Sequence, residues 1–153
     1  MSQAANIETA KKMGEAINSG KLEQFHDIFA ADVVDHDPAP DQGKGPEGFI
    51  GFFTQFRSAF PDLKIAVEHL VADEDNVAIA YTVTGTQDGP FQGIPATGKK
   101  VKARGMQIAK FNSDAKITER WGSSDQLGIL QQIGAVEPVK HLDQPPVLSG
   151  PAV

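Results

Sequence analysis

The sequence predicts one α+β domain, in which helices from the first part of the chain cover one face of a curved, mostly antiparallel sheet. Apolar residues recur at helical spacing up to about residue 60, and beyond it they alternate with a period of two. Helices followed by a run of strands are typical of this class, and a curved sheet covered on one face would enclose a pocket. With 153 residues the chain is long enough for one core. We expect the domain to span residues 1–137, followed by a proline-rich tail, residues 138–153.

Three helices are expected before the strands. An apolar stripe over residues 3–18 predicts the first, and Gly20 suits a left-handed cap at its end. A second, short helix is expected over residues 22–29. Two prolines and two glycines then break the pattern, which predicts a loop. Pro46 is suited to the first turn of a third helix, which should end near Phe60.

About four strands and a closing helix are expected in the second half. The period-two segments cover residues 63–71, 77–83, 100–111 and 115–124. Between the second and third strands lies a long connection, residues 85–98, with four glycines and two prolines. It lacks the Lys-Ser/Thr ending of a phosphate loop, so a tight excursion near the pocket or an interface is the simpler interpretation. A helix over residues 125–133 should close the domain.

The composition argues against several classes of protein. The net charge is −6 and no basic patch stands out, so a nucleic-acid partner is not expected. The absence of cysteine excludes disulfides, zinc–thiolate sites and thiol nucleophiles, and it fits a reducing compartment. Residues 1–12 lack the apolar stretch of a signal peptide, and no apolar run is long enough to cross a bilayer. We therefore expect a cytoplasmic protein with no membrane partner.

Asp125, at the junction of the last strand and the closing helix, is the first candidate for chemistry. Alternation along the strand places it on the same face as Ile117 and Trp121, which mark that face as inward, provided that no bulge intervenes. A carboxylate at the rim of a partly apolar pocket is suited to acid/base work near neutral pH. The alternative is a helix N-cap, which contributes about 1 kcal/mol. The two roles are compatible.

Two further polar side chains are expected on the inward face of the sheet. His69 shares the parity of Ile65 and Val67, so it should point toward the core or the pocket. There it would be either a hydrogen-bonded core histidine or a second catalytic residue that orients or protonates a ligand carbonyl. Tyr81 lies on the corresponding face of the next strand. It would be either a pocket donor or a core tyrosine, and its hydroxyl needs a partner if buried.

Three other residues are candidates for substrate contacts. Asp35-His36-Asp37 suggests a metal site at first, but adjacent residues of an extended chain point in opposite directions, and a surface loop is the simpler interpretation. Trp121 is either a wall of the pocket or a surface on which an aromatic ligand stacks. Arg104 is the one large charged side chain among small neighbours, and its facing is ambiguous: it would contact substrate, solvent or an interface.

Several segments together resemble a known family. They include DVVDHDPAP, the connection GTQDGPFQGIPATG of residues 85–98, and WGSSDQLGILQQIG of residues 121–134. This pattern, over residues 21–135, resembles the SnoaL-like polyketide cyclases, or ester cyclases, of the group with the nuclear-transport-factor-2 (NTF2) fold. The resemblance implies a conical NTF2-like barrel, a homodimer or homotetramer, a hydrophobic small-molecule substrate, and neither metal nor cofactor. It also implies ring closure by intramolecular aldol condensation, with Asp125 as the acid/base and His36 near the pocket mouth.

The resemblance leaves the activity open. The family often has a histidine where this chain has Gln87, which argues against a role for an imidazole in that loop. A non-catalytic domain that binds an apolar molecule is the alternative, as is isomerase or hydrolase chemistry in the same pocket. Small and apolar residues on a sheet face that no helix is expected to cover suggest an interface; they are Ala78, Ala80, Thr82 and Thr84.

Overall fold

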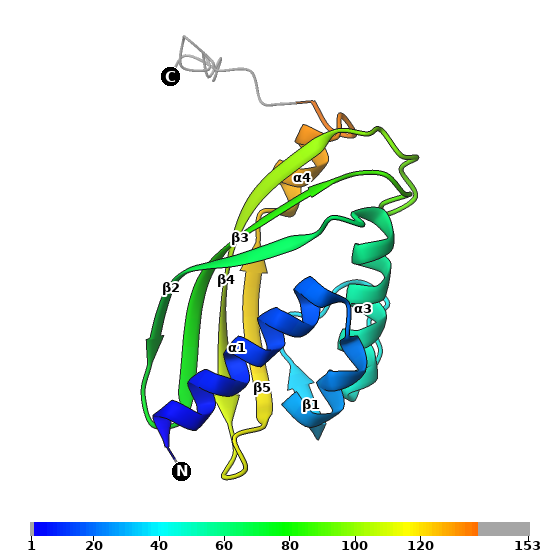
Figure 1. The fold of residues 1–153 in the computed structure, drawn as a ribbon. Coiled ribbons are helices and arrows are strands. Elements are labelled where there is room, and N and C mark those ends of the chain that lie inside the picture. The colour runs from blue at the N-terminus through cyan, green and yellow to red at the C-terminus, as the bar shows by residue number, and fades with distance from the viewer. Residues whose placement is uncertain (1, 138–153) are drawn as a thin grey trace, which may run out of the picture.

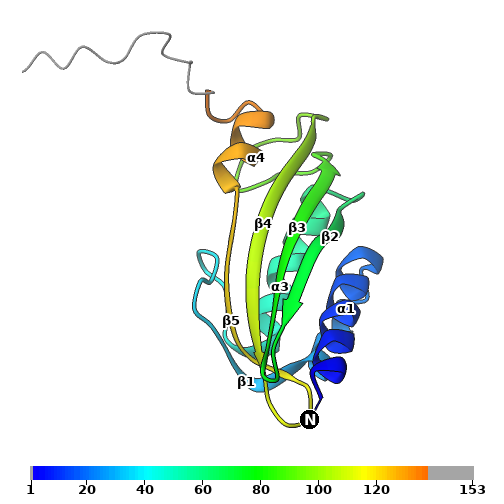
Figure 2. The same ribbon diagram turned by 90° about the vertical axis from the view of Figure 1, so that its left-hand side faces the viewer.

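The computed structural model describes residues 2–137, and the predicted tail lies outside them. The α+β prediction is confirmed: α1 and α3 lie on the same side of a strongly curved five-stranded sheet (Figure 1). Figure 2 looks onto the other face of the sheet, which no helix of the described residues covers. No helix among these residues is both long and apolar enough to span a membrane.

The helices follow the predicted stripes closely. They are α1 (Gln3–Ser19), the 3-10 turn η1 (Leu22–Gln24), α2 (Phe25–Ile28), α3 (Gly45–Ala59) and α4 (Gln126–Gln132). The α1 helix begins where the Ser2 side chain accepts a hydrogen bond from the Ala5 N–H, and it ends at Gly20, whose φ of 79° is left-handed. Pro46 lies in the first turn of α3, as expected.

The sheet has five strands in the order β1-β5-β4-β3-β2. They are β1 (Phe29–Asp35), β2 (Lys64–Ala72), β3 (Asn76–Thr86), β4 (Lys100–Phe111) and β5 (Ile117–Ser124). Strands β2 to β5 form an antiparallel meander, as the alternation predicted. Strand β1 is the exception, because it pairs with β5 in parallel and makes the sheet mixed.

Strand β1 was not predicted, since the sequence suggested a short helix followed by a loop. The helical prediction holds only as far as Ile28, and the chain is extended from Phe29. Phe29 and Val33 are buried in the core, and the strand pairs with β5 more than 80 residues further on, for example Asp35 with Arg120. This pairing is long-range, so the local sequence pattern carried no sign of it.

Two irregularities in the sheet decide which side chains face inward. In β2 the register shifts between Val67 and His69, and in β5 it shifts between Ile117 and Glu119. One extra residue in a strand moves every later side chain to the opposite face. The strict alternation expected from the sequence therefore fails beyond Val67 in β2 and beyond Ile117 in β5.

The core lies between the inward face of the sheet and helices α1 and α3. Phenylalanine supplies much of it: Phe29 stacks on Phe49 with ring centroids 4.3 Å apart, and Phe91 packs edge-on against Phe60 at 5.3 Å. Phe91 belongs to the long connection between β3 and β4, so this packing fixes the connection to α3. The core does not fill the space between the helices and the sheet, and the cavity described next is lined by residues of both α1 and α3.

Candidate functional site

A cavity of about 480 Å³ lies between the helices and the concave face of the sheet. Most of its wall is apolar and comes from α1, α3, β2 and β3; this part includes Met13, Phe49, Phe53, Ile65 and Ile79. The volume and the apolar wall are typical of sites for small organic molecules. Nothing in this part of the wall offers acid/base chemistry, so any reaction depends on the polar residues at its other end.

The polar end of the cavity is built on Arg120 of β5. Its Nη1 lies 3.0 Å from Asp35 Oδ1, and the two side chains are 18% and 7% exposed. Its Nε donates to Gln107 Oε1 at 3.2 Å. Asp35 is fully engaged, because its oxygens also accept from the Gln42 amide and the Asp37 N–H, each at 3.0 Å. A buried ion pair is stable only with such additional hydrogen bonds.

Two glycines give the polar side chains of this end their positions. A Cβ on Gly122 would lie 2.5 Å from Arg120 Nη2, and a Cβ on Gly105 would lie 2.4 Å from the Tyr81 hydroxyl. Gly105 pairs with Ser124 and Gln107 with Gly122, so the two glycines are diagonal neighbours on adjacent strands. The guanidinium and the phenol ring therefore lie flat over backbone that no other residue type would leave open.

Tyr81 lines the cavity, as predicted for a pocket donor. Burial raises the pKa of its hydroxyl above the ordinary value, and the nearby positive charge of Arg120 partly opposes this shift. At neutral pH the hydroxyl is protonated, so it can donate a hydrogen bond into the cavity. Tyr81 is the one residue of the predicted set whose side chain the structure places at the cavity.

Asp125 does not lie where alternation placed it. The bulge near Thr118 turns Arg120 inward and leaves Asp125 exposed, outside the cavity lining. Its Oδ1 accepts from the Gly128 N–H at 2.8 Å, which confirms the helix-cap alternative. The carboxylate packs over Gly128, where a Cβ would meet Oδ2 at 2.2 Å. The expectation that it faces the cavity is wrong, although its neighbours in the chain, Ser124 and Gln126, both line it.

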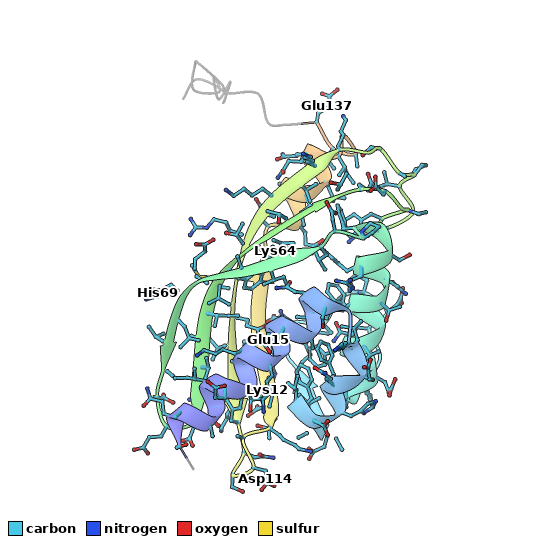
Figure 3. All side chains as sticks on the ribbon, viewed as in Figure 1. Lys12, Glu15, Lys64, His69, Asp114 and Glu137 are labelled. Atoms are coloured by element: carbon cyan, nitrogen blue, oxygen red, sulfur yellow. The ribbon has the colours of Figure 1, made fainter. Side chains whose placement is uncertain are left out.

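His69 is also on the opposite face from the one predicted. The shift of register after Val67 turns it outward, and the side chain is exposed. Figure 3 shows it pointing away from β2 on the side that carries no helix. It lies outside the cavity lining, so the structure does not bring it together with Tyr81 or Asp125.

The other predicted substrate contacts lie on the uncovered face of the sheet. His36 stacks on Trp121 with ring centroids 4.6 Å apart, and its Nε2 lies 3.0 Å from Glu119 Oε1. Arg104 is exposed on β4. None of His36, Trp121 and Arg104 lines the cavity, so the expectation that they border it is wrong. The side chain of Asp35 points to Arg120 instead, and the three residues 35–37 do not converge on a metal site.

The loop between β1 and α3, the long connection between β3 and β4, and the start of α4 contribute residues to the rim of the cavity. Asp37 lines it, with Oδ2 accepting from the Gly122 N–H at 2.9 Å. Across the opening, Gln92 of the long connection donates to Gln126 at the start of α4, at 3.3 Å. Gln92 adopts a left-handed φ of 48° at this point. The connection therefore reaches over one side of the opening, as its glycines and prolines suggested.

Gln87 holds that connection together from inside. The residue is fully buried; its amide donates to the carbonyls of Ile94 and Pro95, and it accepts from the Thr97 hydroxyl at 2.7 Å. It does not line the cavity. The position where the family often has histidine is therefore structural in this chain.

Sequence reasoning missed the residues that form the polar end, namely Asp35, Gln107 and Arg120. Beyond the bulge, the β5 residues that line the cavity are Arg120, Gly122, Ser123 and Ser124, and none of them is a large apolar residue that would have indicated the inward direction. Asp35 was considered only as part of a metal motif. The signal that could have found them is long-range pairing of β1 with β5, which one sequence does not show.

Comparisons with known proteins point to one family. The family model of SnoaL-like polyketide cyclases matches residues 7–133. The comparison with curated proteins gave no match. Among solved structures, TsrD from Streptomyces laurentii is 24% identical with a TM-score of 0.81, covering 89% of this chain and 99% of its own. At this identity the likeness shows the fold.

Two further structures have somewhat higher identity. IdmH from Streptomyces antibioticus, a candidate polyketide cyclase, is 29% identical with a TM-score of 0.74, covering 84% of this chain and 98% of its own. AclR from Streptomyces galilaeus, a candidate hydroxylase, is 26% identical with a TM-score of 0.79, covering 92% of this chain and 87% of its own. With the match of the family model over most of the domain, these findings establish that the chain belongs to the SnoaL-like polyketide cyclase family.

Proposed function

We propose that this protein closes a ring by intramolecular aldol-type condensation in a hydrophobic carbonyl substrate, with an aspartate as acid/base and no cofactor. The observation that carries the proposal is the cavity: about 480 Å³, apolar over most of its wall, with hydrogen-bond donors gathered at one end. An aromatic ester with several carbonyl groups fits a cavity with one apolar part and one polar end. Its rings would occupy the apolar part and its oxygens the polar end. The similarity to IdmH supports the same class.

The reaction requires one proton to leave carbon and one to reach oxygen. A base removes an acidic C–H proton, and the electron pair passes to the carbonyl oxygen as an enolate. The enolate carbon then attacks a second carbonyl group, a C–C bond forms, and the new alkoxide takes up the proton. Conjugation within the substrate delocalises the enolate charge, so a carboxylate and nearby hydrogen-bond donors are sufficient in principle.

We assign the acid/base role to Asp125. It lies in the chain between two cavity-lining residues, Ser124 and Gln126, and its Oδ1 accepts a hydrogen bond from the Gly128 N–H. Rotation of its side chain toward the cavity would give up one helix cap, at a cost of about 1 kcal/mol. Catalytic hydrogen bonds often form only with substrate bound, so this position is compatible with the role. Asp37, the other carboxylate at the rim, is the competing candidate.

Asparagine variants of the two aspartates test the proposal. Asparagine caps a helix as well as aspartate, so Asp125→Asn should keep its free energy of unfolding within about 0.5 kcal/mol. It should lower the rate of cyclisation of aromatic polyketide esters by about a hundredfold or more, because it cannot take up the proton. The matched variant Asp37→Asn should keep most of the activity, since an amide oxygen can still accept from the Gly122 N–H.

The other outcomes separate the alternatives. Loss of activity in Asp37→Asn alone would move the acid/base role to Asp37 and leave the reaction class intact. Full activity in both variants would contradict proton transfer by an aspartate at the rim. If the wild-type protein binds such esters and converts none of them, the non-catalytic binding domain is the correct alternative.

A further inference from the structure

The polar end of the cavity presents donors that have no acceptor. Arg120 uses Nε for Gln107 Oε1 and Nη1 for Asp35 Oδ1 and, at 3.4 Å, for the Asp37 carbonyl. Within residues 2–137, Nη2 has no acceptor. Over the same residues the Tyr81 hydroxyl makes no hydrogen bond, and the Gln107 amide has only a weak contact, 3.9 Å to Met13 Sδ. All three side chains line the cavity.

These donors are held in place before any ligand arrives. Asp35 and Gln107 fix the guanidinium from two sides, and Gly122 allows it to lie against the backbone of β5. Gly105 does the same for the Tyr81 ring on the adjacent strand. Donors fixed in a largely apolar surrounding stabilise a negative oxygen far better than donors in water, because they need not reorient as the charge develops.

The charge of the cluster fits one developing negative charge. Asp35 Oδ1 lies 3.0 Å from Arg120 Nη1, so the carboxylate offsets part of the positive charge. It accepts no hydrogen bond from Nη2, which is left for a ligand. The other two groups each bring a donor: the protonated phenol of Tyr81, and the amide nitrogen of Gln107, whose oxygen already accepts from Arg120 Nε. A carbonyl oxygen that becomes an enolate oxygen therefore matches the site. A ligand cation does not, because Nη2 is itself part of a positive group.

We propose that Arg120, Tyr81 and Gln107 form an oxyanion site that binds the enolate oxygen of an enolisable carbonyl substrate. The inference rests on the proposed function, because it names the group that would receive the electron pair when the base removes the carbon-bound proton. The electron pair of the C–H bond becomes the C=C π bond, the carbonyl π pair moves to the oxygen at Arg120, and the proton passes to the base.

A stable 1,3-diketone tests the site without any knowledge of the substrate. The probe is 1-phenylbutane-1,3-dione, whose enolate absorbs at longer wavelength than its neutral forms. Bound to the wild-type protein, it should ionise at a pH about one unit or more below its value in buffer, a tenfold change in the ionisation constant. Arg120→Met should remove this shift, and Tyr81→Phe should reduce it while changing a single oxygen atom.

Controls separate the oxyanion site from general binding. Arg104→Met, on the uncovered face of the sheet, should keep the wild-type shift. The monoketone 1-phenylbutan-1-one remains neutral, so Arg120→Met should weaken its binding much less than it weakens binding of the diketone enolate. If Arg120→Met does not fold, Tyr81→Phe and Gln107→Leu still test the site.

Two results would overturn the inference. One is an ionisation midpoint of the diketone on the wild-type protein that equals the midpoint in buffer. The other is a shift in Arg120→Met and Tyr81→Phe that is as large as in wild type. Its failure is distinguishable from failure of the proposed function. A shifted midpoint with no cyclisation of any ester would contradict the cyclase proposal alone. Cyclisation that is unchanged by loss of Arg120 and Tyr81 would contradict the oxyanion site alone.

Discussion

At the scale of single residues, the chemistry of the cavity depends on two glycines, Gly105 and Gly122, because they have no side chain. Any side chain at Gly105 would meet the Tyr81 ring, and any side chain at Gly122 would meet the Arg120 guanidinium. Neither glycine has a positive φ. Their role is therefore space, not backbone freedom: they let two large polar side chains lie along the floor of the cavity.

Tyr81 allows a direct titration of this environment. It is the one tyrosine of the chain, so absorbance of the phenolate near 295 nm reports on it alone. Because burial disfavours the charged phenolate, we expect the pKa of the folded protein to lie above the ordinary 10.0. Removing the positive charge with Arg120→Met should raise this pKa further. A midpoint at or below that of the unfolded chain would contradict the burial of Tyr81.

The raised pKa of Tyr81 also predicts how the free energy of unfolding changes with pH. The folded state holds the Tyr81 proton more tightly than the unfolded state, so this group's contribution is fully present below the unfolded pKa. It should be lost as the pH rises through the folded pKa. In Tyr81→Phe the slope of unfolding free energy against pH above 10.0 should be smaller than in wild type, as urea titrations would show.

At the scale of elements, two bulges explain which site predictions succeeded. Alternation on the unbulged strand β3 placed Tyr81 correctly. On β2 and β5 the same reasoning failed beyond the shift, so His69 and Asp125 were expected inside and Arg120 was not. The helices and the meander could be predicted because their signals are local. The bulges and the parallel pairing of β1 could not, because they depend on the partner strand.

Gly14 tests the part that α1 plays in the cavity. It lies in the middle of the helix and lines the cavity, and nothing lies within 4 Å of the place where its Cβ would be. Leucine there should strengthen the helix by up to about 1 kcal/mol and occupy the space meant for a ligand. We expect Gly14→Leu to be at least as stable as wild type and to bind 1-phenylbutan-1-one about tenfold or more weakly, measured by ligand-observed NMR.

Gly51 of α3 supplies the matched control. It too has nothing within 4 Å of a Cβ position, but it is exposed and does not line the cavity. Gly51→Leu should therefore bind the ketone as wild type does. Equal affinity in Gly14→Leu and wild type would mean that the ligand does not occupy the space beside α1.

At the scale of the whole molecule, the uncovered face of the sheet carries exposed apolar side chains on β2 and β4. Val71, Ile108 and Met106 are 55%, 46% and 66% exposed, and the stacked pair of His36 and Trp121 lies at the edge of this patch. Charged side chains of both signs surround it, and the helices cover the opposite face (Figure 2). A second copy of the chain is the occupant that the predicted homodimer or homotetramer requires.

A charge placed in this patch tests that prediction. Met106→Glu should convert the oligomer to a monomer of 16.3 kDa in size-exclusion chromatography with light scattering. Leu127→Glu is the control, because Leu127 is 53% exposed on α4, outside the patch. A wild-type protein that is monomeric at micromolar concentration would contradict the prediction, and so would an oligomer that Met106→Glu leaves intact.

The proposed cyclase reaction and the proposed oxyanion site both require that a proton is removed from a carbon next to a carbonyl group of a ligand in this cavity. The most direct measurement is the exchange of the α-protons of 2-tetralone with D₂O, followed by proton NMR, because it needs no knowledge of the natural substrate. We expect wild type and Arg104→Met to accelerate exchange well above the buffer rate. Asp125→Asn and Gly14→Leu should return it to that rate. Exchange at the buffer rate with wild-type protein and bound ketone would contradict the claim and leave a domain that only binds its ligand.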